Sequence, residues 1–380
     1  MSMRADRILT THVGSLPRPL DVTTIIFRVE KGEQVDEAEH EAVIERAVYD
    51  VVKRQVASGI DIVSDGEMDK ISYATYIKYR ISGFDGDSPR TPPADLEEFP
   101  GFLERQARSG GTPTYKRPQC VGDVRHVDAA PVKRECATFR RAVEAHRPVG
   151  AFLNSASPGV IAMFQPNAYY ATHSAYLEAV SEAMRIEYEA IVDAGFILQI
   201  DSPDLGLGRH MMFKKLDEKE YLARINENVD ALNHALRNVP ADRVRMHVCW
   251  GNYEGPHTHD APLTTVLPVA LRAKPQGLLY ESSNPRHAHE WEDLGQLDIP
   301  SDKVLIPGVV DTTTNFVEHP RLIAQRILNV ARFVGRERVI AGTDCGFSTF
   351  AGYPAIDTDI VYAKFRAMQE GAEMATKALW

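Results

Sequence analysis

The sequence has few cysteines, no long apolar run and no excess of basic residues, and each absence excludes a class of protein. Only four of the 380 residues are cysteine, too few for a small secreted fold held together by disulfides. No segment approaches the roughly 18 consecutive apolar residues that a membrane helix needs. The first six residues include the charged Arg4 and Asp6 and are followed by no apolar stretch of the kind that a secretory signal carries. We therefore expect a cytoplasmic protein with no membrane partner.

Basic residues are outnumbered by acidic ones, with 43 Lys and Arg against 53 Asp and Glu and a formal net charge of −10. A surface that binds nucleic acid needs concentrated Lys and Arg, so nucleic acid is not an expected partner. The chain also lacks a glycine-rich pattern for a dinucleotide or a P-loop phosphate site. Its apolar fraction of 44% and charged fraction of 25% are ordinary globular proportions. A homo-oligomer is compatible with this composition.

Short β-branched runs alternate with longer segments of helical periodicity through most of the chain. The predicted strands are residues 7–12, 60–63, 149–153, 196–201, 244–249, 277–281, 304–310 and 339–342. The predicted helices are residues 37–58, 173–194, 217–237, 262–271, 320–334 and 359–379. Eight strands, most of them followed by a helix, predict an α/β fold of the (β/α)8 TIM barrel type, with residues 1–380 as a single catalytic barrel. An open doubly wound sheet is the alternative.

Residues 82–147 interrupt this alternation. Proline and glycine gather at 88–93, 99–101 and 110–113, and the helical periodicity of the segment is weak. We interpret 82–147 as a long insertion after the second strand, inside the barrel domain and without a core of its own. Its two cysteines, Cys120 and Cys136, are expected to be structural.

The C-terminal ends of the predicted strands carry an unusual number of polar and reactive side chains. In a (β/α)8 barrel this end of the strands is where the chemistry takes place. The residues that fall there are Ser15, Asp65, Glu67, Asn154, Ser155, Asp201, His247, Cys249, Glu281, Asp311, Asp344 and Cys345. A rim with a purely structural role has no need of so many carboxylates and sulfur atoms, so we expect the functional site at this rim.

His247 and Cys249 stand two residues apart in a predicted strand, so their side chains project to the same side. With Glu281 and Cys345 at the ends of other strands they offer one nitrogen, two sulfur and one oxygen donor, a set that suits tetrahedral Zn²⁺. The alternative is that the short H-x-C pattern belongs to the core, where cysteine is common. A thiolate-rich zinc site would activate a substrate thiol as a nucleophile, so this set favours alkyl transfer to a thiol over hydrolysis.

Two further histidine pairs lie in predicted rim loops. His257 and His259 could form a second metal pair, and His287 and His289 fall in the same category. We interpret all four as loop residues near the rim. Arg286, in the loop that carries His287, could meet an anionic substrate group.

Six short motifs follow one another in a diagnostic order. They are His12-Val-Gly-Ser-Leu-Pro-Arg18, Asp65-Gly-Glu67, Gln199-Ile-Asp201, His247-Val-Cys249, Tyr280-Glu-Ser282 and Asp344-Cys-Gly346. In this order the chain resembles the C-terminal catalytic barrel of cobalamin-independent methionine synthase, over about residues 7 to 350 apart from 82–147. The resemblance implies a Zn²⁺ cofactor bound by His247, Cys249, Glu281 and Cys345. It also implies that Ser15, Glu67 and Asp201 bind the amino-acid part of homocysteine, with Glu67 and Asp201 as the catalytic carboxylates.

The implied function is transfer of a methyl group to homocysteine or a related thiol, so the partners are a small-molecule thiol and an alkyl donor. The single-barrel relative epoxyalkane:coenzyme M transferase implies an alternative, the addition of a zinc-bound thiol to an epoxide. A sulfonate thiol would need an arginine clamp, for which Arg18, Arg209 and Arg286 are candidates. The metal-free relative uroporphyrinogen decarboxylase leaves the H-x-C and Asp-Cys-Gly motifs unexplained. A non-catalytic metal- or ligand-binding barrel is the alternative from another class.

The chain departs from the family pattern at two places. Asp201-Ser-Pro203 stands where the family usually has Asp-Glu-Pro, so one carboxylate is missing. The chain also lacks the extra N-terminal half of the long enzymes, which helps to bind their folate donor. Both departures concern the alkyl donor more than the thiol acceptor, and the donor is left open.

Overall fold

The structure is a computed structural model that describes residues 6–108, 116–352 and 356–380. The expectation drawn from the first six residues falls almost wholly outside these ranges, and the predicted turn at 110–113 does so completely.

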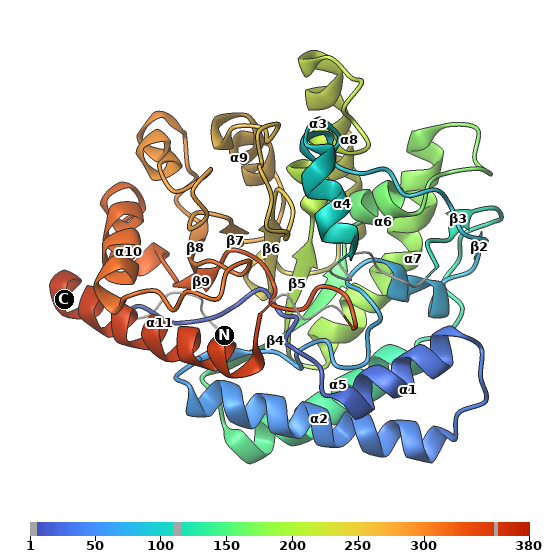
Figure 1. The fold of residues 1–380 in the computed structure, drawn as a ribbon, viewed down its shortest axis with the longest axis horizontal. Coiled ribbons are helices and arrows are strands. Elements are labelled where there is room, and N and C mark those ends of the chain that lie inside the picture. Colours follow the sequence, from blue (N-terminus) through green and yellow to red (C-terminus); the bar gives the residue numbers. More distant parts are fainter. Residues whose placement is uncertain (1–5, 109–115, 353–355) are drawn as a thin grey trace.

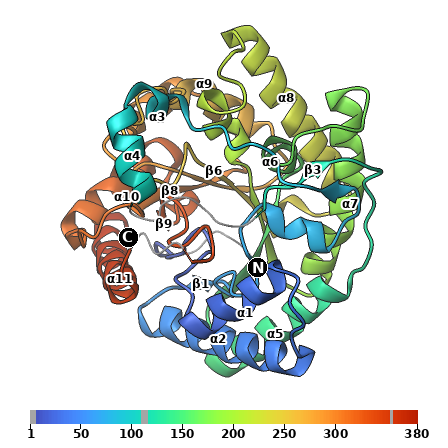
Figure 2. The ribbon, with the colours of Figure 1, turned by 45° about the vertical axis from the view of Figure 1, so that its right-hand side comes forward.

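A curled sheet of seven parallel strands forms the centre of the molecule (Figures 1 and 2). In sheet order the strands are β1 (Ile62–Val63), β4 (Gly150–Ala156), β5 (Ile197–Asp201), β6 (Val244–Val248), β7 (Gly277–Tyr280), β8 (Val304–Val310) and β9 (Gly342–Thr343). Each strand pairs in parallel with the next. This sheet confirms the predicted α/β fold of barrel type.

The first predicted strand, residues 7–12, is reduced to two isolated bridges. Thr10 pairs in parallel with Ala341 just before β9, and Thr11 pairs in parallel with Ile62 of β1. The N–H of Ala341 donates to the carbonyl of Leu9 over 2.8 Å, and the N–H of Ile62 donates to the carbonyl of Thr10 over 3.1 Å. Residues 9–11 therefore connect the two edges of the curled sheet and complete the eighth position of the barrel.

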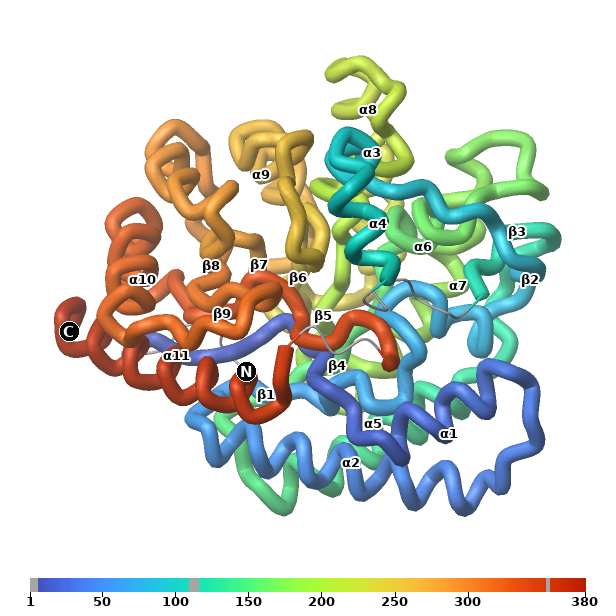
Figure 3. The backbone as a smooth tube through the Cα atoms, in the orientation of Figure 1, coloured from blue at the N-terminus to red at the C-terminus, as the bar shows by residue number. Residues whose placement is uncertain are grey.

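Helices surround the sheet on its outer side (Figure 2). They are α1 (Leu20–Glu30), α2 (Glu37–Ala57), α5 (Ala130–His146), α6 (Pro158–Phe164), α7 (His173–Asp193), α8 (Glu218–Ala235), α9 (Leu263–Leu271), α10 (Pro320–Val334) and α11 (Thr358–Leu379). Local sequence sets their starts, because Asp36, Thr172, Asp217 and Asp357 accept hydrogen bonds from the free N–H groups of the first turn. Figure 3 shows the last helix, α11, beside α10 and α2.

The barrel interior holds a small apolar cluster, and a larger one lies between sheet and helices. The inner cluster consists of Leu9, Val13, Ile62, Phe152, Ile197, Leu279, Val304, Ile306 and Ile340. Arg245 of β6 is buried beside it, with its guanidinium 3.5 Å from the centroid of the Phe152 ring. This packed interior closes the lower part of the barrel, so the upper, C-terminal ends of the strands are left for a pocket.

Residues 82–147 contain more regular structure than their composition indicates. They form the short antiparallel strands β2 (Phe84–Asp85) and β3 (Gln119–Cys120), the helices α3 (Ala94–Glu98) and α4 (Pro100–Arg108), and then α5. The helix α5 packs between α2 and α7, where a barrel helix between β1 and β4 belongs. Its apolar face was not predicted, because Val132, Cys136 and Phe139 are separated by charged residues. No helix among the described residues is both long and apolar enough to cross a membrane.

Candidate active site

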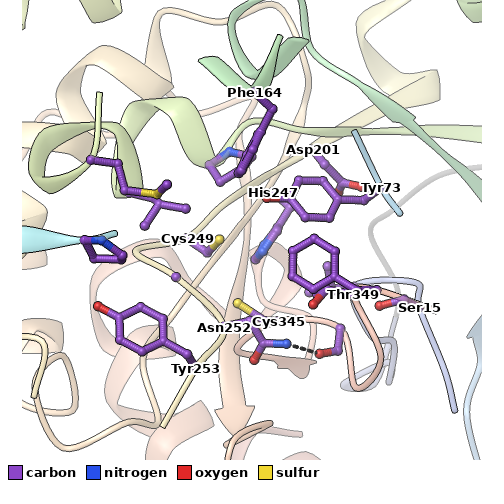
Figure 4. Close-up of a pocket in the computed structure, with 18 of the residues that line it drawn as sticks. Ser15, Tyr73, Phe164, Asp201, His247, Cys249, Asn252, Tyr253, Cys345 and Thr349 are labelled. Atoms are coloured by element: carbon purple, nitrogen blue, oxygen red, sulfur yellow. Dashed lines mark hydrogen bonds between the residues drawn. The ribbon is translucent and has the colours of Figure 1, made fainter. Parts of the chain in front are cut away.

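A pocket of about 240 Å³ opens at the C-terminal ends of the strands (Figure 4). Six of the residues predicted from the sequence line it, namely Ser15, Glu67, Asp201, His247, Cys249 and Cys345. The other walls come from α3, α4 and the segment before them, from α6 and from the loops after β1, β5, β6 and β9. The topology therefore gathers residues from distant parts of the sequence around one cavity, as expected for the functional end of a barrel.

Three soft donors converge at the floor of this pocket. A ring nitrogen of His247 and the sulfur atoms of Cys249 and Cys345 all lie within 4.8 Å of one another, and all three residues are buried. Two sulfur ligands of one tetrahedral zinc stand about 3.8 Å apart, given Zn–S bonds of about 2.3 Å. Nδ1 of His247 is buried without a hydrogen-bond partner. The residues present therefore fit a thiolate-binding metal such as Zn²⁺.

Glu281, the fourth predicted ligand, lies beside this group but outside it. Its Oε1 accepts hydrogen bonds from the backbone N–H of Trp250 over 2.7 Å and from the Cys345 thiol over 3.5 Å. Its Oε2 accepts from the Asn284 amide over 2.6 Å. The carboxylate is thus in contact with one cysteine, and backbone and side-chain donors fix its orientation.

Burial keeps the three donors uncharged as long as no metal is bound. It lowers the pKa of His247 to about 3, with a smaller contribution from Arg245, so the imidazole is neutral and able to ligate. A hydrogen bond from Cys345 lowers the pKa of the Cys249 thiol, but burial and the nearby Glu281 raise it more. Burial and the neighbouring Cys249 raise the pKa of Cys345 well above its ordinary value. A bound divalent cation would supply the positive charge that two thiolates need here.

Asp344 joins the loops that carry Glu281 and Cys345. Its carboxylate accepts hydrogen bonds from three successive backbone N–H groups, those of Ser282, Ser283 and Asn284, at 2.8 to 2.9 Å. It immediately precedes Cys345 in the chain. The Asp of the Asp-Cys-Gly motif therefore fixes one loop of the cluster against the other.

Glu67, in the turn after β1, and Asp201, at the end of β5, line the pocket. Gly66 and Glu67 have φ angles of 71° and 55°, a left-handed turn in which the N–H of Glu67 donates to Oδ1 of Asp65 over 3.0 Å. Oε2 of Glu67 is buried without a hydrogen-bond partner. Burial raises the pKa of Glu67 to about 7 and that of Asp201 to about 6. Two buried carboxylates of this kind can bind an ammonium group or exchange a proton near neutral pH.

Four residues that support these carboxylates were not assigned a role from the sequence. The amides of Asn154 and Gln199 donate to Asp201 over 2.9 and 3.0 Å. Arg245 fixes Gln199 from below over 2.7 Å, and Lys70 donates to the carbonyl of Asn154 over 2.7 Å. Asn154 was noted only as a strand end. Gln199 was noted only as part of the Gln199-Ile-Asp201 motif. Lys70 and Arg245 gave no usable signal, because the sequence does not show which distant residue a charged side chain contacts.

Three of the four histidines expected in the rim loops, His257, His259 and His287, contact carboxylates, and the fourth, His289, is exposed. His257 and His287 both contact Oδ2 of Asp260, each over 2.9 Å. Burial is the largest single effect and lowers the pKa of each histidine, but the hydrogen bond with Asp260 and the charges of the neighbouring carboxylates together raise it, to about 9 for His257 and about 10 for His287. His259 is exposed and pairs with Glu98 over 2.9 Å. Apart from the His247 cluster, no three potential ligand atoms in the part of the chain that the structure describes all lie within 4.8 Å of one another.

The arginines proposed for a sulfonate clamp lie elsewhere. Arg18 donates to the carbonyls of Glu67 and Ser348, over 3.1 and 2.8 Å. Arg209 donates to the carbonyl of Leu216 over 3.0 Å, and Arg286 is exposed. None of these three is among the described residues that line the pocket.

Comparison with known proteins gives one family. A family model described as "Cobalamin-independent synthase, Catalytic domain" matches residues 8–261. The methionine synthase of Saccharolobus solfataricus is 25% identical over 376 residues, which cover 97% of this chain and 95% of that relative. The methionine synthase of Sulfolobus acidocaldarius is 23% identical over 339 residues, covering 89% of this chain and 85% of the relative.

A solved structure has a similar fold. It is a B12-independent methionine synthase from Shewanella sp. in complex with selenomethionine, with a TM-score of 0.76 and 18% sequence identity. The alignment covers 98% of this chain and 99% of the Shewanella chain. At 18% sequence identity, this similarity shows that the two proteins share a fold.

Proposed function

Because the chain belongs to the family of cobalamin-independent synthase catalytic domains, we propose that it is a zinc-dependent methyltransferase acting on the thiol of homocysteine or a related small thiol. The observation that carries the proposal is the convergence of His247, Cys249 and Cys345 in the pocket that Glu67 and Asp201 also line. Soft ligands for a thiol-binding metal and carboxylates for an ammonium group are what an amino-acid thiol requires.

In this proposal His247, Cys249 and Cys345 hold Zn²⁺, and Glu281 completes the set. Zinc bound there would supply a Lewis acid that lowers the pKa of the substrate thiol and keeps its sulfur nucleophilic at neutral pH. Glu281 is suited to this role because Trp250 and Asn284 already fix its carboxylate beside Cys345.

The other residues orient the substrate and accept its proton. Asp201 and Glu67 bind the ammonium group, and Ser15 lies beside them at the pocket wall. The unpartnered Oε2 of Glu67 can accept the thiol proton, since a pKa of about 7 suits proton uptake at neutral pH. The apolar walls exclude water from the reacting sulfur and orient it toward the methyl donor.

The runner-up is addition of a sulfonate thiol to an epoxide. The three arginines expected to clamp a sulfonate, Arg18, Arg209 and Arg286, do not line the pocket, whereas Arg90 and Arg117 do. We rank this reading second because Glu67 and Asp201 also line the pocket and suit an ammonium group. We also propose that residues 82–147 belong to a single barrel domain, since α5 packs between α2 and α7 and the segment before α4 lines the pocket.

The test is metal analysis combined with thiol binding. Protein isolated without chelators should hold close to one zinc per chain, and Cys249→Ser should lose it. Cys136→Ser is the matched control, because Cys136 is equally buried but lies on α5, away from the pocket. Calorimetry of the zinc-loaded protein should show tighter binding of homocysteine than of 2-mercaptoethanesulfonate. Wild-type zinc below about 0.2 per chain, or zinc retained by Cys249→Ser, would sink the proposal.

A further inference from the structure

Three buried histidines from three different loops meet at the carboxylate of Asp260. Oδ2 of Asp260 lies 2.9 Å from Nδ1 of His257 and 2.9 Å from Nε2 of His287, and its Oδ1 lies 3.3 Å from Nε2 of His210. His210 follows β5, His257 follows β6 and His287 follows β7. These four residues, which we call the Asp260 cluster, are not among the described residues that line the pocket. One carboxylate therefore joins the loops after three neighbouring strands.

The cluster holds Trp250 through three contacts. Nε2 of His210 lies 3.0 Å from the Trp250 carbonyl. The rings of His287 and Trp250 lie 4.4 Å apart, centroid to centroid. The indole N–H donates to the carbonyl of Ala261, the residue after Asp260, over 2.6 Å. Because Trp250 is fully buried, these contacts fix both its backbone and its ring.

Trp250 in turn fixes one of the proposed zinc ligands. Its backbone N–H donates to Oε1 of Glu281 over 2.7 Å, and it directly follows Cys249 in the chain. The same Oε1 accepts from the Cys345 thiol. The carboxylate oxygen that contacts a sulfur ligand is therefore the oxygen that Trp250 holds.

The charges of the Asp260 cluster indicate more than packing. Burial lowers the pKa of His257 and His287, but the hydrogen bond with Asp260 and the neighbouring carboxylates together raise it to about 9 and about 10. Both rings are therefore protonated at neutral pH, and the Asp260 carboxylate lies between two cations. Apolar side chains would join the loops with less loss of hydration, whereas charge-assisted hydrogen bonds set direction as well as distance. The cluster is suited to setting an orientation.

Building on the proposed zinc-dependent methyl transfer, we propose that Asp260 is a positioning residue for the metal site. It acts through His210 and His287 on Trp250. The N–H of Trp250 then holds the Glu281 carboxylate toward the sulfur ligands. Residues that orient a metal ligand in this way change metal affinity by about 10- to 100-fold.

The first test is the zinc affinity of Asp260→Asn, which keeps the size of the side chain and removes its charge. Competition with a chromogenic chelator should show an affinity about 10- to 100-fold below that of the wild type. Glu187→Gln is the matched control, because Glu187 is also a buried carboxylate and pairs with Arg80 over 2.8 Å, but lies on α7. This control should bind zinc as the wild type does. Equal zinc affinities in Asp260→Asn and the wild type would overturn the proposal.

A double variant tests whether the effect passes through Glu281. Asp260→Asn should lower zinc affinity much less in a Glu281→Gln background than in the wild type, because the residue on which it acts is already changed. An equal loss in both backgrounds would overturn the proposal, since Asp260 would then act on the protein as a whole. If Asp260→Asn does not fold, His287→Gln takes its place with an expected loss of about tenfold, and no loss would count against the proposal.

Cobalt in place of zinc gives a readout that a loss of stability does not change. The visible absorption of bound Co²⁺ depends on its ligands and their geometry. Asp260→Asn should therefore shift the spectrum in the same direction as Glu281→Gln does. A spectrum identical to that of the wild type would contradict the positioning role.

The proposed function and the role of Asp260 fail in different ways. Wild-type protein that holds no zinc would refute the proposed function, and the role of Asp260 with it. Wild-type protein that holds zinc with an affinity that Asp260→Asn leaves unchanged would refute only the role of Asp260.

Discussion

The side chains of Glu67 and Asp201 illustrate how burial prepares single residues for chemistry. Both carboxylates lie in the pocket, and burial raises the pKa of each above its ordinary value. Asn154 and Gln199 oppose this shift at Asp201, because their amides donate to its charged form. At neutral pH Asp201 is therefore mainly ionised, while Glu67 is close to half protonated.

We predict that binding of an amino-acid ligand weakens as the pH falls through this range. The carboxylates attract an ammonium group only when ionised, so affinity is full above the Glu67 pKa of about 7 and is lost through the Asp201 pKa of about 6. Methionine is the ligand to titrate, because it carries the ammonium group without a thiol proton. Between pH 8 and pH 5 its affinity, measured by calorimetry, should fall at least about tenfold.

Asp201→Asn is the matched variant for this titration. It removes the step that Asp201 contributes, so the affinity for methionine should change with pH only near pH 7, where Glu67 titrates, and by a smaller factor. An affinity for methionine that stays constant from pH 5 to pH 8 in the wild type would contradict the assignment of both carboxylates.

At the scale of elements, loops after the strands position the side chains. Gly14, in the first motif, has a φ of 140°, and a Cβ there would lie 2.2 Å from Oδ1 of Asn154. Asn154 in turn donates to the carbonyl of Val13 and to Asp201. The turn at Gly14 therefore positions the side-chain amide of Asn154 on β4, and that amide orients the carboxylate of Asp201.

Gly14→Ala should therefore harm both stability and substrate binding. We expect a loss of at least about 1 kcal/mol in the free energy of unfolding by urea, together with a higher KM for the thiol as Asn154 is displaced. Gly32→Ala is the control, because Gly32 has a φ of 72° but a Cβ there would meet no atom within 4 Å. Gly32→Ala should lose only the stability that an alanine with a positive φ costs, with an unchanged KM. An unchanged KM for Gly14→Ala would contradict the inference that Gly14 positions Asp201 through Asn154.

Asp344 connects the loop that carries Cys345 with the loop that carries Glu281. Asp344→Ala removes the acceptor of three backbone N–H groups next to Glu281, so zinc affinity should fall about 10- to 100-fold without loss of a ligand. Competition with a chromogenic chelator measures this. Asp311→Ala is the control, since Asp311 bonds the hydroxyls of its own loop. Equal zinc affinities in the two variants would refute the role of Asp344.

At the scale of the whole molecule, residues 94–108, which form α3 and α4, cover the pocket of the barrel, and we call them the cover. Leu96 of α3 lines the cavity, and its neighbour Asp95 is fully buried. Asp95 accepts from the Tyr253 hydroxyl over 2.6 Å and from the His257 N–H over 2.8 Å. One carboxylate therefore anchors the cover to the loop after β6.

Removing this anchor should loosen the cover. Asp95→Ala leaves the Tyr253 hydroxyl and the His257 N–H without their acceptor, a cost of about 1 to 3 kcal/mol. We expect faster amide exchange in residues 94–108 and a lower kcat/KM. Glu98→Ala, which removes only exposed contacts with Thr258 and His259, is the control. Unchanged exchange in Asp95→Ala would show that the cover is held by other contacts.

The sequence by itself determined the alternation of strands and helices and which residues stand at strand ends, because these depend on periodicity and on position along the chain. It predicted six pocket residues, since parallel strands must bring their C-terminal ends to one rim. It did not predict α5, where the buried Cys136 follows Arg134 and Glu135, or the segment over the pocket, where the buried Asp95 is itself a charged residue. Nor did it give the supporting residues Lys70 and Arg245 or the aromatic residues Tyr73, Phe164 and Phe350 of the pocket lining. Those depend on contacts between residues far apart in the chain, and only the tertiary structure decides which distant side chains meet.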